Sequence, residues 1–291
     1  MAATEMSDIT DILPNRPAAL EEIEVDLFIS ALHHGHGYDF SGYSRASLTR
    51  RVHNLVRTFA VPSITHLTAL ILHEPTRLPE VISGLSVPVS EFFRDPQVFR
   101  ALKEEVFPIL ASYPAINIWQ AGCAHGQEVY SLAILLQEAG LYERARIYAT
   151  DMSAAALATA REGIFPLPDA REAAARYLAA GGAGSFSDYY HARYDLMKLD
   201  ERLISRVTFA QHNLVTDAVF CEAHLILCRN VLIYFTNPLQ NKVLEMFAQS
   251  LVRGGFLCIG TRENLDFSPA SMRFNPVDGQ ARIYRLKKSG E

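Results

Sequence analysis

Residues 116–131, INIWQAGCAHGQEVYS, decide how this chain of 291 residues folds. An apolar run that ends at Trp119 predicts a buried strand, and Gly122 and Gly126 mark a tight loop directly after it. From Glu128 onward the apolar residues recur at helical spacing, as they do on one face of a packed helix. The stretch therefore predicts a strand, a glycine loop and a helix, with backbone that can approach a ligand where no Cβ intrudes.

A second short strand is predicted over residues 147–149 and leads to Asp151, whose carboxylate can accept from both hydroxyls of a ribose. The loop spacing G-x-x-x-G lacks the third glycine of a dinucleotide-binding loop. Glu128 would repel a phosphate but could hold an ammonium group. An adenosine joined to an amino acid is S-adenosylmethionine, which these residues favour over a dinucleotide. The alternative at this point is an ordinary strand, loop and helix that bind no ligand.

The composition limits the class of protein. With 49% hydrophobic residues, the chain can bury one large domain and a smaller one. A net charge of -5 disfavours nucleic-acid binding, and the sequence contains neither a signal-peptide pattern nor an apolar run of membrane-spanning length. We therefore expect a cytoplasmic protein that is not inserted in a membrane.

The cysteines and histidines form no pattern typical of a metal site. The four cysteines lack paired C-x-x-C spacing and are expected to be reduced and buried. They are Cys123, Cys221, Cys228 and Cys258. The sequence HHGH at 33–36 has no partner cluster of cysteines or carboxylates, so we expect it in a solvated loop and predict no metal site.

Changes in apolar periodicity divide the chain into parts. Residues 1–20 are expected to form a flexible leader, and 21–86 a small all-helical domain. Residues 87–291 follow the βαβ rhythm of an α/β domain, which is interrupted over 165–205 by an insertion with aromatic, strand-like character. An insertion beside a ligand cleft is a usual place for substrate recognition.

A helix predicted within residues 44–60 has an apolar stripe and an opposite basic face. This basic face consists of Arg45, Arg50, Arg51, His53 and Arg57. In an acidic chain it indicates a docking site for an acidic partner, whereas the alternative is a solvated charged surface.

Two further regions supply candidate site residues. The segment VSEFFRDPQVF at 89–99 joins the domains, and Arg94 within it is either a surface charge or a side chain aimed into the ligand cleft. Ligands of parallel sheets bind beyond the carboxyl ends of the strands, which places Asn213, Arg229 and Asn230 on the cleft side.

The sequence resembles the CheR family of chemoreceptor glutamate methyltransferases over residues 22–287. Six segments carry the resemblance in order, namely YDFSGYSRASLTRR, VSEFFRDPQVF, WQAGCAHGQEVYSLA, IYATDMS, CRNVLIYF and GGFLCIGTREN. It implies a helical amino-terminal domain and a Rossmann-like S-adenosylmethionine domain with an inserted small antiparallel β-subdomain. It also implies methyl transfer to glutamate side chains on cytoplasmic receptor helices, with S-adenosylhomocysteine as the second product. We expect the protein to be a monomer.

The resemblance also assigns roles by position. Cofactor binding falls on Ser90, Arg94, Gly122, Glu128, Asp151, Asn213, Leu214, Arg229 and Asn230. Ser90, Arg94 and Tyr234 line the implied methyl-transfer site, where we expect the Arg94 guanidinium to position the substrate carboxylate and the Tyr234 phenol to orient it. The basic face, with Arg45, Arg50, Arg51 and Arg57, would then dock the acidic helices of a receptor.

The chain departs from the family pattern at several positions. Pro88 and Ser90 stand where asparagine and threonine are frequent, Gln127 replaces a glutamate, and Arg262 lies where serine is frequent. The insertion also differs in length and character, which leaves open a signalling system other than chemotaxis. Two other functions remain possible from sequence: a non-catalytic S-adenosylmethionine-binding signalling module and, less well matched to the glycine spacing, a nicotinamide-dependent oxidoreductase.

Overall fold

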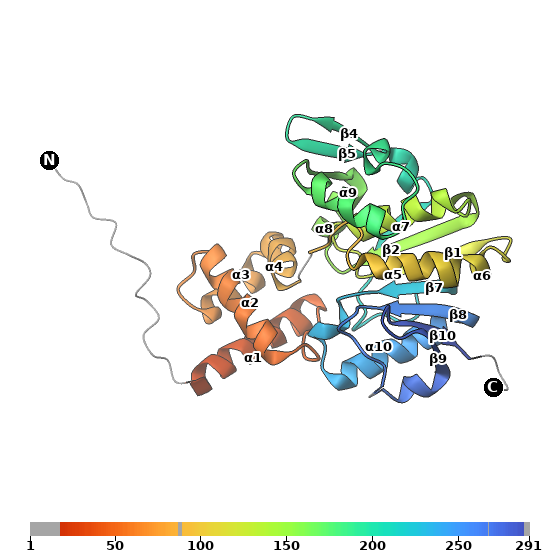
Figure 1. The fold of residues 1–291 in the computed structure, drawn as a ribbon. Helices are drawn as coiled ribbons and strands as arrows, with labels where there is room; N and C mark the ends of the chain where they lie inside the picture. The colour runs from red at the N-terminus through yellow and green to blue at the C-terminus, as the bar shows by residue number, and fades with distance from the viewer. Residues whose placement is uncertain (1–17, 87–88, 267, 288–291) are drawn as a thin grey trace. The chain divides into compact units, whose positions relative to one another are not determined.

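The computed structural model describes residues 18–86, 89–266 and 268–287 (Figure 1). The chain forms two compact units, Met1–Leu85 and Ser86–Glu291. Pro88 and residues 1–17 of the predicted leader lie outside the described residues. The last three residues of that predicted leader already belong to the first helix, which begins at Ala18.

The first unit is helical. Its helices are α1 (Ala18–His36), α2 (Arg45–Thr58), α3 (Ile64–His73) and α4 (Leu78–Leu85), with a 3-10 turn at Pro75–Arg77. The side chain of Ser63 caps α3 by accepting a hydrogen bond from the His66 N–H. The histidines of HHGH lie in the last turn of α1, where the His36 ring contacts the Ile71 carbonyl at 2.8 Å. The prediction of a loop at 33–36 is therefore wrong, because α1 extends through these residues and packs beside α3.

The second unit is built on a seven-stranded sheet with the order β6-β2-β1-β7-β8-β10-β9. These strands are β1 (Ile116–Ala121), β2 (Ala145–Asp151), β6 (Val207–Gln211), β7 (Ala223–Cys228), β8 (Leu251–Ile259), β9 (Phe274–Asp278) and β10 (Ile283–Leu286). The strands from β6 to β8 are parallel, whereas β10 is antiparallel to both neighbours. The mostly parallel sheet confirms the predicted α/β fold.

The strand order reverses between β1 and β7. From β1 the chain runs outward to β2 and β6, and it then returns to the other side of β1 as β7 and β8. The crossover helices are α7 (Gln127–Glu138), α8 (Ala154–Glu162) and α10 (Asn237–Ser250). Figure 1 shows α7 above the sheet and α10 below it. Ligands of such sheets bind at the carboxyl edge beside this reversal.

A second, three-stranded antiparallel sheet has the order β3-β5-β4. Its strands are β3 (Ile164–Pro166), β4 (Tyr190–Arg193) and β5 (Leu196–Leu199), and α9 (Asp169–Ala179) lies between β3 and β4 in the chain. This confirms the predicted antiparallel insertion, which projects at the top of Figure 1.

Aromatic packing joins this small sheet to the segment that precedes α5 (Pro96–Ala101). The ring of Phe92 lies 5.1 Å from the ring of Phe165, and Phe93 lies 5.3 Å from Tyr177. After α5 the chain continues through a π-helical turn, Leu102–Val106, and α6 (Phe107–Leu110) into β1. The packing therefore fixes the segment around Arg94 against the insertion.

Candidate active site

The parallel strands bring most of the predicted site residues to one edge of the large sheet. Asp151 is the last residue of β2, Gly122 follows β1, and Arg229 follows β7. Asn213 lies two residues after β6, whose last residue pairs with Asp151. Leu214, which follows Asn213, is buried. Residues far apart in the sequence are therefore neighbours at this edge.

The glycine loop has a backbone conformation that would be strained if residues other than glycine stood at positions 122 and 126. Gly122 has φ +75° and Gly126 has φ +88°, both in the left-handed region. A Cβ on Gly122 would lie 2.6 Å from a methyl carbon of Val231, and one on Gly126 would lie 2.8 Å from the Cβ of Ala160. The loop is therefore packed closely on both sides, which fixes the backbone that a ligand would meet.

Asp151 holds this loop from the neighbouring strand. Its carboxylate accepts from the N–H of Ala124 and from the N–H of Ser153, both at 2.9 Å. Burial raises the pKa of Asp151, and the hydrogen bonds from Ser153 and Ala124 oppose that rise. Each carboxylate oxygen can accept more than one hydrogen bond, so both retain capacity for the predicted ribose contact.

Arg229 is the centre of a buried ion-pair cluster. Its guanidinium, on a side chain that is 1% exposed, donates to Glu128 at 2.5 Å and to Asp95 at 2.8 Å. It also donates to the carbonyl oxygen of Arg94 at 2.9 Å. Although burial alone would lower the pKa of Arg229, Glu128 and Asp95 raise it on balance. The sequence predicted a cofactor contact for Arg229, which stays a prediction; its contacts within the protein join the end of β7 to α7 and to the segment around Arg94.

The segment that carries Arg94 is held in an uncommon conformation. Phe93 and Asp95, on either side of Arg94, have φ values of +49° and +53°, which cost roughly 1–3 kcal/mol each for non-glycine residues. The Phe93 N–H donates to the hydroxyl of Ser131 on α7 at 2.9 Å. The side chain of Arg94 is half-buried and makes no hydrogen bond or ion pair with any residue that the structure describes. A constrained backbone thus presents an uncommitted guanidinium.

Ser90 supports the same region. Its hydroxyl accepts from the N–H of Glu128 at 3.3 Å, which satisfies one of the unpaired donors in the first turn of α7. The predicted site residues Ser90 and Glu128 are therefore in direct contact. One oxygen of the Glu128 carboxylate pairs with Arg229, and the other has no hydrogen-bond partner within the described ranges.

Tyr234 lies on a turn that a buried carboxylate organises. This turn, Leu232–Tyr234, follows β7, and Tyr234 is half-buried. The carboxylate of Glu263 accepts from the N–H groups of Asn230 and Ile233, both at 3.2 Å, and from that of Gly260 at 2.5 Å. Burial raises the pKa of Glu263, while these hydrogen bonds oppose the rise. Sequence reasoning missed Glu263, although an acid four residues after the buried apolar strand β8 (Leu251–Ile259) was an available signal.

The basic face of α2 is smaller than the sequence predicted. Arg50 and Arg57 are exposed, and Arg45 pairs with Asp26 at 2.6 Å. Arg51 is buried and donates to the carbonyl of Leu85, so its assignment to an exposed docking surface is wrong. Arg51 lies beside the apolar stripe of α2 that packs on α4, and Val52 and Leu55 of this stripe are buried with it.

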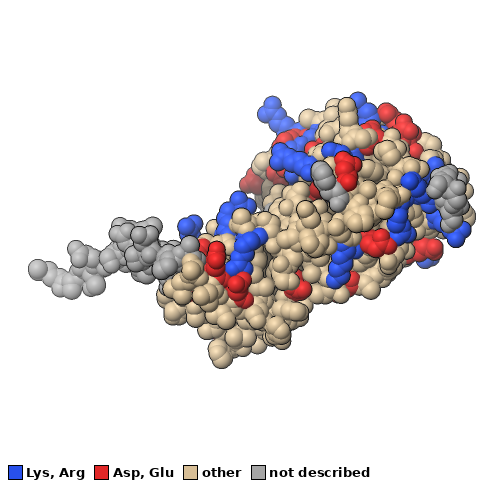
Figure 2. All heavy atoms as spheres, turned by 90° about the horizontal axis from the view of Figure 1, so that it is seen from below, with Lys and Arg blue, Asp and Glu red and all other residues tan. Residues whose placement is uncertain are grey.

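The other residues of the basic face border a shallow groove along α1 and α2. Arg45, Arg50, His53 and Arg57 line it together with Glu21 and Glu22. On the face that Figure 2 shows, basic and acidic side chains are interspersed, without one continuous basic surface. Any docking on this unit therefore depends on a few positions.

Residues 18–86, 89–266 and 268–287 contain neither a metal-binding cluster nor a membrane-spanning helix. In these ranges no three histidine, cysteine, aspartate or glutamate side chains are grouped as a metal ion requires. No helix in the same ranges is long and apolar enough to cross a membrane.

The charges at the carboxyl edge fit the predicted cofactor. Asp95, Glu128 and Asp151 supply three carboxylates at this edge, against the two guanidiniums of Arg229 and Arg94. A surplus of negative charge suits a ligand with sulfonium and ammonium groups and opposes a pyrophosphate. Asp151, Glu128 and Asn213 are the residues that would hold such a ligand.

Comparison with known sequences gives two family matches. Residues 88–282 match the CheR methyltransferase SAM-binding domain, and residues 23–86 match the CheR methyltransferase all-alpha domain. The chain is 45% identical over 264 residues to a putative methyltransferase Cher3 of Pseudomonas putida, covering 91% of this chain and 97% of that one. It is 30% identical to a chemotaxis protein methyltransferase of Listeria monocytogenes, covering 83% of this chain and 87% of that protein.

A similar match is the chemotaxis protein methyltransferase of Vibrio parahaemolyticus, which is 32% identical over 77% of this chain and 83% of its own length. Among solved structures, the N-methyltransferase NodS of Bradyrhizobium japonicum in complex with S-adenosyl-L-homocysteine superposes with a TM-score of 0.40 and 13% identity. That superposition covers 69% of this chain and 89% of NodS.

Proposed function

We propose, because the chain belongs to the CheR methyltransferase family, that it methylates glutamate side chains in the cytoplasmic helices of a signalling receptor. The family match across 88–282 establishes an S-adenosylmethionine-dependent methyltransferase domain. The choice of glutamate, and of a receptor, is our proposal. The observation that carries it is the uncommitted guanidinium of Arg94 on a segment fixed by Ser131 and Arg229.

The methyl-transfer reaction mainly requires that the substrate carboxylate be aligned with the methyl group of the cofactor. A glutamate has a reference pKa of about 4.3, so its carboxylate is already ionised at neutral pH and needs no general base. When bound, S-adenosylmethionine supplies a methyl group on a sulfonium, and its transfer forms one oxygen–carbon bond, breaks one carbon–sulfur bond and yields a methyl ester and S-adenosylhomocysteine. Because an anion and a cation become neutral products, a site that excludes water favours the reaction.

The protein's contribution comes from the residues around Arg94. Its guanidinium can bind both oxygens of the substrate carboxylate, which sets the direction from which the carboxylate approaches. Tyr234 can donate to one of these oxygens from the turn that Glu263 holds. Asp151 and Glu128 remain available for the ribose and the ammonium group of the cofactor. Ser90 and Arg229 position Glu128 and therefore act through it.

The test is to replace Arg94 by alanine and by lysine and to measure transfer of labelled methyl groups to a receptor cytoplasmic fragment as base-labile esters. We expect Arg94→Ala to lower kcat about 100-fold, because the carboxylate loses its alignment. Arg94→Lys should recover only part of this loss, since an ammonium group lacks the planar fork. Calorimetry should show that affinity for S-adenosylhomocysteine changes much less than kcat.

Arg146→Ala is the matched control, because Arg146 is an exposed arginine near the opposite, amino-terminal end of β2. Equal turnover by Arg94→Ala and the unchanged protein would remove Arg94 from the mechanism. Binding of S-adenosylhomocysteine without methylation of any receptor fragment would instead indicate a non-catalytic signalling module.

The exposed part of the basic face supplies the second element of the proposal. Arg50 and Arg57 are free of ion pairs within the described part of the helical unit, so their charges are available to an acidic partner. We propose that they attract the acidic helices of the receptor, in a manner that weakens as salt increases.

A further inference from the structure

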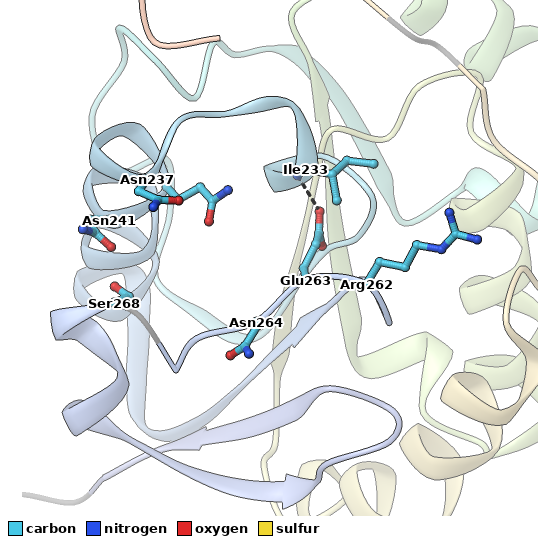
Figure 3. Close-up of a pocket in the computed structure, with 8 residues that line it drawn as sticks. Ile233, Asn237, Asn241, Arg262, Glu263, Asn264 and Ser268 are labelled. Atoms are coloured by element: carbon cyan, nitrogen blue, oxygen red, sulfur yellow. Dashed lines mark hydrogen bonds between the residues drawn. The ribbon is translucent and has the colours of Figure 1, made fainter. Parts of the chain in front are cut away.

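A polar pocket lies beside the turn that carries Tyr234 (Figure 3). It has a volume of about 180 Å³, and its lining residues include Asn237, Gln240, Asn241, Arg262, Glu263 and Asn264. We call this the amide pocket, because four of these six side chains are carboxamides. In Figure 3, α10 presents Asn237 and Asn241 on one side, whereas Arg262 lies beyond Glu263 with its guanidinium turned away from the two asparagines, at the rim of the pocket.

Three of the lining residues are already committed to the protein. Gln240 donates to the carbonyls of Leu232 and Phe235, both at 3.0 Å. Asn264 accepts from the Asp266 N–H at 2.5 Å, and the Glu263 carboxylate is occupied by backbone N–H groups. These contacts hold the walls of the pocket in place.

The side chains of Asn237, Asn241 and Arg262 are uncommitted. None of the three makes a hydrogen bond or ion pair with a residue in the described ranges. Two carboxamides offer four N–H donors, and an arginine offers five more together with a positive charge. The two carboxamides therefore offer donors to a ligand inside the pocket, and Arg262 adds one positive charge at its rim.

The charge balance of the pocket favours an anionic ligand. Glu263 is 4% exposed, and its charge is directed at three backbone N–H groups rather than at the pocket opening. Arg262 is exposed and keeps its whole charge for a partner. A carboxylate only accepts hydrogen bonds, so it matches these donors, whereas a lysine side chain would be repelled by Arg262.

The pocket's position connects it to the proposed reaction. Ile233 lines the pocket and precedes Tyr234 on the same turn, and the Ile233 N–H is held by Glu263. With about 30 Å³ per water molecule, the volume corresponds to roughly six waters. That space is sufficient for one short acidic side chain of a bound protein segment.

We propose that the amide pocket binds a second carboxylate of the substrate protein, near the glutamate that is methylated, and that Arg262 makes the enzyme selective for acidic neighbours. This inference rests on the proposed function. Because serine is frequent at this position in the family pattern, the selectivity would be a property of this chain's own arginine.

The test uses the full-length protein and two synthetic helical peptides, each with one glutamate. In one peptide the positions three and four residues from the glutamate on both sides are aspartate, and in the other they are asparagine. Aspartate supplies the neighbouring carboxylate without supplying a second glutamate. We expect the unchanged protein to methylate the aspartate peptide with a kcat/KM about fivefold higher, as a partly exposed charge contact gives.

Arg262→Gln should reduce this ratio to about one, and Asn241→Leu should reduce it as well, because each removes donors from the pocket. Arg253→Gln should leave the ratio unchanged, since Arg253 is an exposed arginine near the start of β8, away from its carboxyl end. Binding of S-adenosylhomocysteine by each variant, measured by calorimetry, confirms that the protein is folded.

Two negative results have different meanings. If the fivefold preference is absent, or persists in both Arg262→Gln and Asn241→Leu, the subsite is overturned while the proposed function stands. If the unchanged protein binds S-adenosylhomocysteine and methylates neither peptide, the proposed function fails and the subsite falls with it.

Discussion

At the scale of single residues, Asp151 connects the fold to cofactor binding. Its carboxylate already holds the glycine loop through two backbone N–H groups, and the proposed ribose contact would use its remaining acceptor capacity. Asp151→Asn should weaken binding of S-adenosylhomocysteine roughly 10- to 100-fold, because hydrogen bonds to a charged acceptor are lost. Isothermal calorimetry on the purified full chain measures this directly.

Because Asp151 also organises the loop, the loss of affinity must be separated from a loss of structure. Glu162→Gln is the control, since Glu162 is an exposed acid at the end of α8, which follows β2. Both variants should unfold cooperatively in a thermal scan. Unchanged affinity in a folded Asp151→Asn variant would remove Asp151 from cofactor binding.

The sequence predicted the location of residues better than it predicted their partners. The end of β2 at Asp151 was predictable, because the apolar run stops there. The pairing of Arg229 with Asp95 was not, since these residues are 134 positions apart and only the folded sheet brings them together. The burial of Arg51 was equally hidden, because an arginine beside an apolar stripe has the same sequence pattern whether its side chain points outward or inward.

At the scale of secondary-structure elements, α7 and the segment around Arg94 act as one part through Ser131. The Ser131 hydroxyl accepts from the buried N–H of Phe93 and donates to the carbonyl of Gln127 at 2.7 Å. Ser131→Ala leaves the Phe93 N–H without its partner, which should lower the free energy of unfolding by about 1–3 kcal/mol. It should also lower kcat more than cofactor affinity, because Arg94 is displaced while Asp151 is not.

Urea unfolding and methyl-transfer kinetics measure these two effects. Ser112→Ala is the control, because its hydroxyl makes a hydrogen bond to the Ile109 carbonyl at an exposed site. A Ser131→Ala variant that loses stability but retains kcat would show that α7 supports the fold without positioning Arg94.

Helices and strands whose apolar residues recur with a clear period were predictable from the sequence. Features that depend on neighbouring elements, such as which helix face is buried, were not. The apolar run that includes Leu225 to Cys228 predicted β7, since parallel strands are covered on both faces. In α1 the helical spacing was correct, yet Ile23 and Leu27 are each 55% exposed while Val25 and Phe28 are buried. An apolar residue at helical spacing therefore identifies a helix without identifying which face packs.

At the scale of the whole molecule, the chain carries a net charge of -5 but keeps exposed arginines on the helical unit. Repulsion between an acidic enzyme and an acidic receptor would slow their encounter, so local positive charge matters more than the total. The two units have separate tasks in the proposed function: the helical unit attracts the substrate, and the sheet unit carries out the transfer. This division predicts that substrate capture and cofactor binding respond differently to salt.

Reversing two charges tests this division. Arg50→Glu combined with Arg57→Glu should lower kcat/KM for a receptor fragment roughly 5- to 20-fold in low salt, because attraction becomes repulsion. The difference from the unchanged protein should largely disappear in 0.5 M salt, where screening is effective within a few ångströms. Arg146→Glu combined with Arg253→Glu changes the net charge equally on the sheet unit and should have a much smaller effect. Equal losses in both double variants would assign the effect to total charge and contradict docking at α2.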